Sequence, residues 1–136
     1  MGVERFVLDA SALLRLFFQQ AGAARVEAVL DRAVMSAVNY AEVVAKLADR
    51  GVPMNAVAAD LADLDLEIVP VDRALADDAG WIGAGPNRSG LAVTDRCCLA
   101  LARRLGAVAM TTDRGWPPIG AAIGVAVEVL PDHATG

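Results

Sequence analysis

Two aspartates of this chain each close a short apolar run. Asp9 follows residues 6–8, and Asp113 follows residues 108–112, a similar run that ends in two threonines. Short runs of this kind are typical of buried strands. Because open α/β sheets bind their ligands outside the carboxyl ends of the strands, both acids are candidates for a site at that edge of a sheet.

Two further acids have helical settings. Glu42 is the only acid in residues 35–48 and has apolar neighbours, although a surface ion pair with Lys46 explains it equally well. Asp95 falls in the first turn of a predicted helix, where the helix dipole alone favours an acid. Asp113 has a comparable alternative, an ordinary aspartate turn before a glycine and two prolines. Taken singly, none of these acids compels a site.

Several other acids have sufficient structural explanations. Asp72 also ends a predicted strand, but it is expected to cap the next helix and is left outside the site. Five more acids are expected on solvated helix faces, namely Asp60, Asp63, Asp65, Asp77 and Asp78.

Predicted strands and helices alternate along the chain. The expected strands are residues 6–8, 33–36, 66–71, 107–110 and 125–130, and the expected helices are residues 11–18, 23–31, 38–50, 53–64, 72–81 and 91–105. Residues 83–90 are expected to be a loop and residues 111–120, with two adjacent prolines, an irregular connection. The alternation predicts a three-layer α/β/α sandwich around a mainly parallel sheet, with about five short strands and six to seven helices.

A parallel sheet would bring the four candidate acids together. Asp9 and Asp113 would end neighbouring strands. Helices that return antiparallel to the strands begin at the same edge, which is where Asp95 and Glu42 would lie. Two carboxylates roughly 4 Å apart repel by about 4 kcal/mol at an effective dielectric constant near 20. Such acids must share protons or bind cations, and all-oxygen ligands favour Mg²⁺ or Mn²⁺ over Zn²⁺.

The composition is that of one apolar, acidic domain. The chain has 136 residues, and we expect a single domain over residues 1–131 with a flexible tail over residues 132–136. Hydrophobic residues make up 56% but aromatic residues only 4%, so the core is expected to be aliphatic and part of the apolar surplus to be covered by a partner. The net charge of −5 has the wrong sign for binding nucleic acid by bulk charge alone.

The remaining signals concern location and reactive side chains. The sequence has no signal-peptide pattern and no apolar run long enough to span a membrane, so we expect a cytoplasmic protein. Cys97 and Cys98 are adjacent and are expected to be reduced core thiols. His133, the only histidine, lies in the expected tail, which disfavours a histidine-based nuclease.

Four stretches resemble, in order, the motifs of the PIN domain. They are VLDASALL at residues 7–14, SAVNYAEV at residues 36–43, GLAVTDRCCLA at residues 90–100 and TTDR at residues 111–114. Each motif alone is weak, but four in order over nearly the whole chain are specific. Their order and the small single domain resemble the VapC toxins of type II (VapBC) toxin–antitoxin pairs.

The resemblance implies a metal-dependent endoribonuclease, a hydrolase of RNA phosphodiester bonds that uses Mg²⁺ or Mn²⁺. Its catalytic and metal-binding acids would be Asp9, Glu42, Asp95 and Asp113, with Glu42 acting directly or through water. Thr111 and Ser11 would support them, and Arg88, Arg96 and Arg114 would hold flanking phosphates. Thr112 stands where many relatives have a small residue. This departure does not change the assignment of the four acids. A salt bridge to a neighbouring acid is an alternative role for Arg96.

The resemblance also implies partners: an RNA substrate, with tRNA or another structured RNA among the candidates, a small VapB-like antitoxin, and a second copy in a homodimer. The alternative function is a PIN-like module that binds RNA or a partner without cutting. A phosphoaspartate receiver domain is disfavoured because Asp9 has no acidic neighbour and the late strands carry no lysine.

Overall fold

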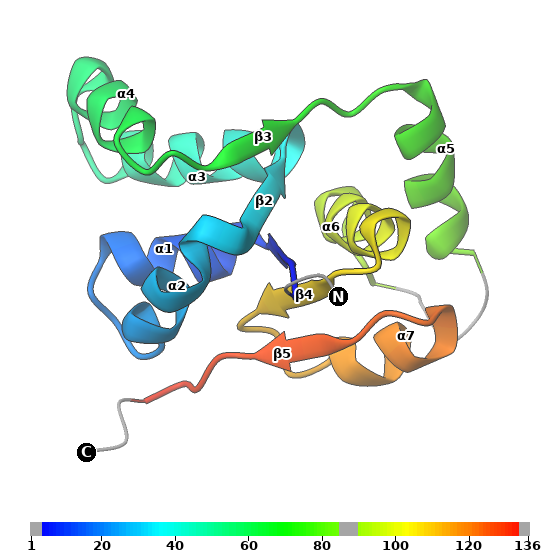
Figure 1. Cartoon of the computed structure of the whole chain (residues 1–136). Helices are drawn as coiled ribbons and strands as arrows, with labels where there is room; N and C mark the ends of the chain where they lie inside the picture. Colours follow the sequence, from blue (N-terminus) through cyan, green and yellow to red (C-terminus); the bar gives the residue numbers. More distant parts are fainter. Residues whose placement is uncertain (1–3, 85–89, 134–136) are drawn as a thin grey trace.

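Five parallel strands form a single sheet in the order β3-β2-β1-β4-β5 (Figure 1). The computed structural model describes residues 4–84 and 90–133. The strands are β1 (Phe6–Leu8), β2 (Ala33–Ser36), β3 (Glu67–Val69), β4 (Val108–Thr111) and β5 (Val127–Val129). The chain proceeds from β1 outward to β3 and then returns to place β4 on the other side of β1. This reversal makes a topological switch point between β1 and β4, where sheets of this kind bind ligands.

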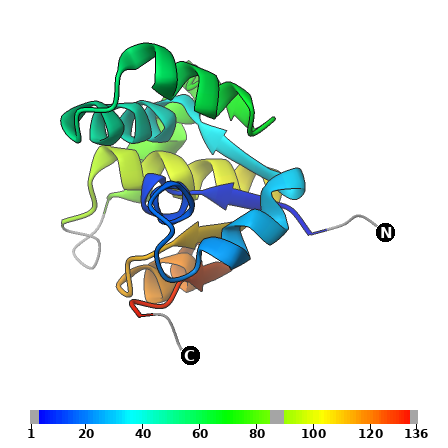
Figure 2. The same cartoon turned by 90° about the vertical axis from the view of Figure 1, so that its left-hand side faces the viewer.

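Helices cover both faces of the sheet, as Figures 1 and 2 show from two directions. The layer on the face of Phe6 and Leu8 consists of α1 (Ala10–Phe17), α2 (Ala23–Val29), α3 (Ala37–Asp49) and α4 (Met54–Ala62). The layer on the face of Val7 consists of α5 (Arg73–Ile82), α6 (Val93–Leu105) and α7 (Trp116–Ile123). A short 3₁₀ helix (Leu30–Arg32) joins α2 to β2. The predicted three-layer sandwich is confirmed, with seven α-helices and five strands in residues 4–84 and 90–133.

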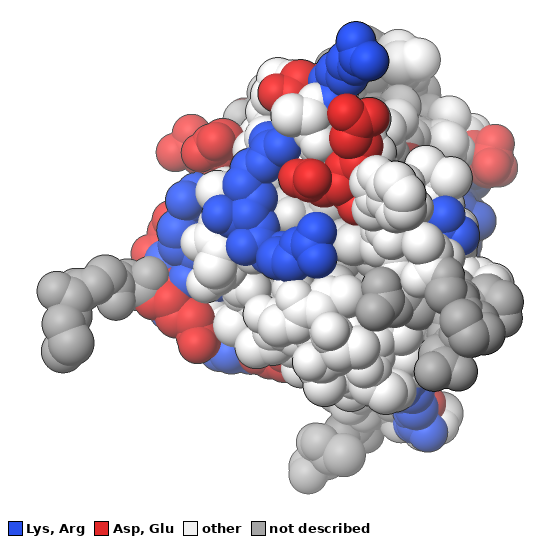
Figure 3. All heavy atoms as spheres, turned by 90° about the vertical axis from the view of Figure 1, so that its right-hand side faces the viewer, with Lys and Arg blue, Asp and Glu red and all other residues white. Residues whose placement is uncertain are grey.

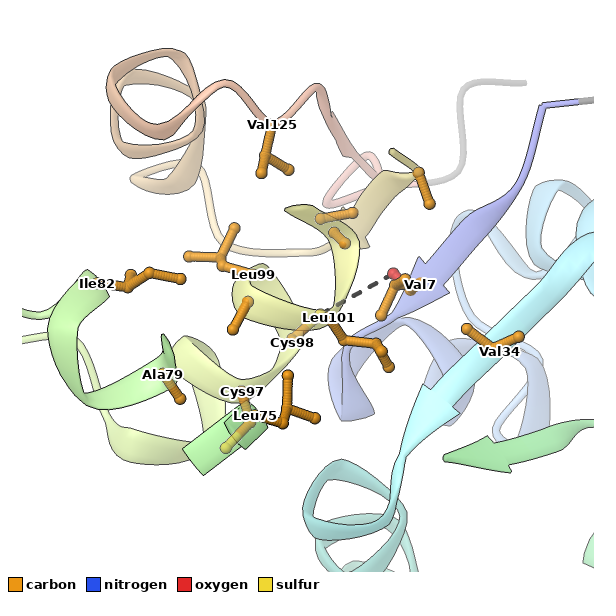
Figure 4. Close-up of a cluster of buried hydrophobic side chains, with 14 of the residues drawn as sticks. Val7, Val34, Leu75, Ala79, Ile82, Cys97, Cys98, Leu99, Leu101 and Val125 are labelled. Carbon is orange, nitrogen blue, oxygen red and sulfur yellow. Dashed lines mark hydrogen bonds between the residues drawn. The ribbon is translucent and has the colours of Figure 1, made fainter. Parts of the chain in front are cut away.

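The core is aliphatic on both sides of β1. Side chains alternate along a strand, so Val7 enters one core while Phe6 and Leu8 enter the other. Figure 4 shows the Val7 side, where leucines of α5 and α6 pack together and the Cys98 thiol lies 3.9 Å from the carbonyl oxygen of Val7. Cys97 and Cys98 are both buried free thiols. Because both faces of β1 are packed in a core, the strand holds Asp9, the residue that follows it, in a fixed position.

The segment after β4 differs from its prediction. Residues 111–120 were expected to be irregular because of two adjacent prolines, but α7 begins at Trp116 and includes both. Pro117 and Pro118 occupy the first helical turn, where no N–H group is needed for the helical ladder. The buried Trp116 indole anchors this end of the helix. The prediction of an irregular connection was therefore wrong beyond Gly115.

The other predicted elements are confirmed within a few residues. β2 has its predicted bounds, whereas β3 ends at Val69 instead of continuing to Val71. α2 ends at Val29, and the last residues of that predicted helix form the 3₁₀ turn. Residues 85–89 of the predicted loop lie outside the described residues.

The surface has exposed apolar side chains on several elements. The large ones are Met54 on α4, Ile68 on β3, Trp81 on α5 and Val93 on α6. Figure 3 shows the side of the molecule that carries α5 and α7, where many charged side chains lie along the top and the left and an uncharged area lies in the lower middle. Within residues 4–84 and 90–133, no helix is long and apolar enough to cross a membrane.

Candidate active site

Asp9 lies directly beyond β1 and remains tied to the sheet. Its N–H donates to the carbonyl oxygen of Met110 over 2.9 Å, which continues the ladder between β1 and β4 past the end of the strand. The side chain is 7% exposed. Its Oδ2 accepts hydrogen bonds from Ser11 Oγ at 2.7 Å and from Thr111 Oγ1 at 3.0 Å. Burial raises the pKa of Asp9 above its ordinary value, and the two hydroxyl donors oppose that rise.

The same hydroxyls connect the ends of β1 and β4. Ser11 Oγ accepts from the Thr112 N–H at 3.1 Å, and Thr111 Oγ1 accepts from the Asp113 N–H at 3.2 Å. Each hydroxyl thus donates to Asp9 and receives from the turn that carries Asp113. The structure places Ser11 and Thr111 beside Asp9, where the sequence predicted them.

Glu42 stands one turn into α3, on a half-buried part of the helix. Burial raises its pKa most, and the negative charge of Asp9 raises it further. Lys46 lowers this pKa only weakly, and no ion pair within 4.0 Å joins it to Glu42 in the part of the chain described. These observations favour an acid within electrostatic reach of Asp9 over the surface pair.

Asp95 belongs to the first turn of α6. Its Oδ2 accepts a hydrogen bond from the Ala92 N–H at 3.3 Å, so it also serves the helix terminus as its alternative interpretation predicted. Its pKa is raised to about 6 by burial and then by the charges of Asp9, Glu42 and Asp113. Asp95 is therefore within electrostatic reach of the other three candidate acids.

Asp113 is exposed, in the turn that follows β4. Its Oδ1 accepts from the Gly115 N–H at 2.8 Å, which is the aspartate turn that the sequence offered as an alternative. Its charge is nevertheless among the smaller influences that raise the pKa of Asp95, so it lies within electrostatic reach of that acid. Asp113 therefore both stabilises the turn and contributes charge to the acidic cluster.

The donor set of this cluster is made of oxygen alone. No three Asp, Glu, His or Cys side chains within residues 4–84 and 90–133 lie close enough to hold one ion directly among them. Mg²⁺ characteristically retains several water molecules and takes only one or two protein carboxylates. Burial and the charges of neighbouring acids raise the pKa of both Glu42 and Asp95, and an all-oxygen group of this kind fits a hydrated hard cation.

Asp72 has the structural role predicted for it. It is the N-cap of α5, and its Oδ1 accepts from the Leu75 N–H at 2.9 Å. Arg104 lies 3.9 Å from the same oxygen. These contacts occupy Asp72 at the helix terminus.

The arginines do not contact the acidic cluster in the part of the chain described. Arg96 Nε donates to the carbonyl oxygen of Leu91 at 3.1 Å, and its guanidinium lies where a Cβ on Gly83 would be. Arg114 is exposed and pairs with Asp132. Arg88 lies outside the described residues. The sequence offered an ion pair with a neighbouring acid as an alternative role for Arg96. In the structure its described contacts are with Leu91 and beside Gly83, at the two ends of the connection between α5 and α6.

One residue of the site was missed from the sequence. Asn39 is fully buried at the start of α3, and its Nδ2 donates to Glu42 Oε1 at 3.2 Å. The signal was an amide in the first turn after a serine N-cap, three residues before the candidate acid. Asn39 also donates to the carbonyl oxygen of Thr94 on α6, and this partner could not be predicted from the local sequence.

Residues 6–121 match the PIN domain family. The protein belongs to that family, as its four motifs predicted. No curated protein matches the sequence.

Solved structures show the same fold. The chain is similar to VapBC from Salmonella typhimurium, solved bound to DNA, with a TM-score of 0.72 and 20% identity over 93% of this chain and 98% of that one. FitAcB from Neisseria gonorrhoeae gives 0.69 and 23% over 90% and 95%. VapBC2 from Rickettsia felis, bound to a DNA fragment of its promoter, gives 0.68 and 14% over 93% and 98%.

Proposed function

We propose that this protein is a metal-dependent endoribonuclease that hydrolyses RNA phosphodiester bonds. The observation that supports the proposal is that Asp9, Glu42, Asp95 and Asp113 come from the ends of β1 and β4 and the first turns of α3 and α6, where burial and then the charges of the other three acids raise the pKa of Asp95 to about 6. A cluster of this charge repels a phosphodiester unless a cation lies between them. Membership of the PIN domain family supports the same chemistry.

Asp9, Asp95 and Asp113 would hold hydrated Mg²⁺ or Mn²⁺, in part through the water molecules of the ion, and Glu42 would complete the shell directly or through water. When bound, such an ion lowers the pKa of a coordinated water and stabilises the charge that develops on the phosphate. The chain's own contribution is orientation. Ser11 and Thr111 hold one oxygen of Asp9 in place.

The proposed biological role is that of the toxin in a VapBC-type pair, in the cytoplasm. The structures similar to this chain include VapBC and FitAcB complexes, some of them bound to DNA. A small VapB-like antitoxin and a second copy of the chain are the proposed protein partners. Exposed apolar side chains such as Trp81, which is 75% exposed, are compatible with such partners.

The nuclease proposal is tested with the chain purified free of any partner. Total RNA is incubated with the wild type, with Asp9→Asn and with Asp72→Asn, each with and without Mg²⁺ or Mn²⁺. We expect cleavage that requires metal, falls by at least about a hundred-fold in Asp9→Asn and persists in Asp72→Asn. Equal cleavage by Asp9→Asn would identify a contaminant and remove the proposal.

A non-cleaving PIN-like binding module is the second candidate. It is favoured by the local structural roles of Asp95 and Asp113, whose carboxylates also serve a helix start and a turn. The same assay separates the two functions when RNA binding is measured beside cleavage. A wild type that binds RNA without cutting it under any metal condition supports the module.

A further inference from the structure

Asn39 forms hydrogen bonds with three elements around the acidic cluster. Its Oδ1 accepts from Ser36 Oγ at 2.5 Å, and its Nδ2 donates to Glu42 Oε1 at 3.2 Å and to the carbonyl oxygen of Thr94 at 3.1 Å. Both Asn39 and Ser36 are fully buried. Every one of these partners lies at the end of β2 or in the first turns of α3 and α6.

The partners fix which way the amide points. If the amide were turned over, its oxygen would face the Glu42 carboxylate and the Thr94 carbonyl, which are both acceptors. The Ser36 hydroxyl is held in turn, because its oxygen accepts from the Asn39 N–H at 3.2 Å while its proton goes to Oδ1. The network therefore has one arrangement, which the two acceptors set and the Ser36 hydroxyl completes.

Asn39 joins the helices that carry two of the acids. Glu42 is three residues further along α3 and shares a helix face with Asn39. The Thr94 carbonyl precedes Asp95 at the start of α6. Because one NH₂ group binds both, it sets where Glu42 stands relative to Asp95. As a neutral donor, Asn39 holds the carboxylate without placing a positive charge that would compete with a cation.

We propose that Asn39, supported by Ser36, is the positioning residue that holds Glu42 and the start of α6 in register for metal binding. This inference rests on the proposed function, since Glu42 matters here as part of a metal site. Partners behind ligating carboxylates characteristically contribute ten-fold to a hundred-fold to metal affinity or activity.

The test compares Asn39→Leu and Ser36→Ala with Asn55→Leu, which makes the same change at an exposed asparagine of α4. Mn²⁺ alone is titrated into each protein by calorimetry, and kcat and KM for RNA cleavage are measured across Mn²⁺ concentrations. We expect Asn39→Leu to bind Mn²⁺ roughly ten-fold to a hundred-fold more weakly. Its kcat should fall with little change in KM and recover in part at high Mn²⁺. Ser36→Ala should show a smaller loss and Asn55→Leu none.

A purely structural role predicts a different result. Asn39→Leu and Ser36→Ala would then melt at lower temperature, while the folded fraction bound Mn²⁺ and cleaved RNA as the wild type does; that result overturns the positioning role. If Asn39→Leu does not fold, an unchanged Mn²⁺ affinity in Ser36→Ala overturns it equally. A wild type that neither binds Mn²⁺ nor cleaves RNA overturns the proposed function itself, so the two failures are distinguishable.

Discussion

At the scale of single residues, the site depends on hydroxyl groups as much as on acids. Asp9 is held by Ser11 from its own helix and by Thr111, which is 102 residues away in the sequence. Burial alone would favour the protonated form of Asp9, and these donors favour the charged form that a cation needs. The hydroxyls thus counteract the cost of placing a carboxylate at the end of a buried strand.

Thr111→Val tests this support without changing the shape of the side chain. The variant removes the donor to Asp9 Oδ2 and the acceptor of the Asp113 N–H. We expect RNA cleavage at limiting Mn²⁺ to fall roughly ten-fold to a hundred-fold. The free energy of unfolding should fall by about 1 kcal/mol. Cleavage rates across Mn²⁺ concentrations and urea denaturation provide the two measurements.

Thr112→Val is the matched control. Thr112 is the next residue, and its hydroxyl makes no hydrogen bond within the described residues, although its N–H donates to Ser11. The control should keep wild-type cleavage. If Thr111→Val and Thr112→Val are equally active, the Thr111 hydroxyl has no part in holding Asp9.

At the scale of elements, two aspartates in similar sequence settings have different roles. Asp9 and Asp72 each follow a strand and precede a helix. Asp72 lies after β3, at the edge of the sheet, and is committed to the N–H of Leu75. Asp9 lies after β1, at the switch point, beside the hydroxyls of another strand. The position of the strand in the sheet, which no local pattern encodes, separates the cap from the site.

Asp72→Ala measures the cap directly. The loss of a hydrogen bond to the first turn of α5 should lower the free energy of unfolding by about 1 kcal/mol, read from urea denaturation. Asp72→Asn should be close to the wild type in stability, because asparagine caps helices about as well as aspartate. Both variants should cleave RNA normally when folded. A folded Asp72→Ala protein that no longer cleaves would place Asp72 in the site after all.

The helix that the sequence missed shows what local signals lack. Adjacent prolines are typical of irregular segments, but at the start of a helix they cost no hydrogen bond. What decides the outcome for α7 is tertiary: Trp116 is buried, and a Cβ on Gly120 would lie 2.5 Å from the carbonyl oxygen of Val125. Such close packing against the entry to β5 cannot be read from the segment itself.

At the scale of the molecule, most of the fold could be predicted because its strands are short apolar runs between amphipathic helices. The acids could be predicted together because a parallel sheet gathers the carboxyl ends of its strands. Asn39 could not, since a buried amide is identified by its partners, and one of them lies 55 residues away. The unpredicted part is thus the Asn39 network around Glu42, whereas the hydroxyls of Ser11 and Thr111 were predicted beside Asp9.

The raised pKa values of the clustered acids should also determine how the free energy of unfolding depends on pH. In the folded protein the pKa of Asp95 is about 6, against a model-peptide value of 3.8, and those of Asp9 and Glu42 are raised too. Between these pH values the folded state binds more protons than the unfolded state. Stabilisation is therefore present below pH 4 and is lost as the pH rises through about 6. We expect the metal-free protein to lose on the order of 1 kcal/mol across this window, since Asp95 is only half-buried.

Thermal denaturation from pH 4 to pH 7, with and without Mn²⁺, measures this effect. Asp95→Asn should flatten the pH dependence, while Asp63→Asn, the same change at an exposed acid, should leave it unaltered. Mn²⁺ should raise the melting temperature at pH 7 by binding the folded state and should have a smaller effect at pH 4, where Asp95 is protonated. A metal-free protein that becomes more stable as the pH rises through this window would mean that burial and the neighbouring acids do not raise the pKa of Asp95 in the folded state.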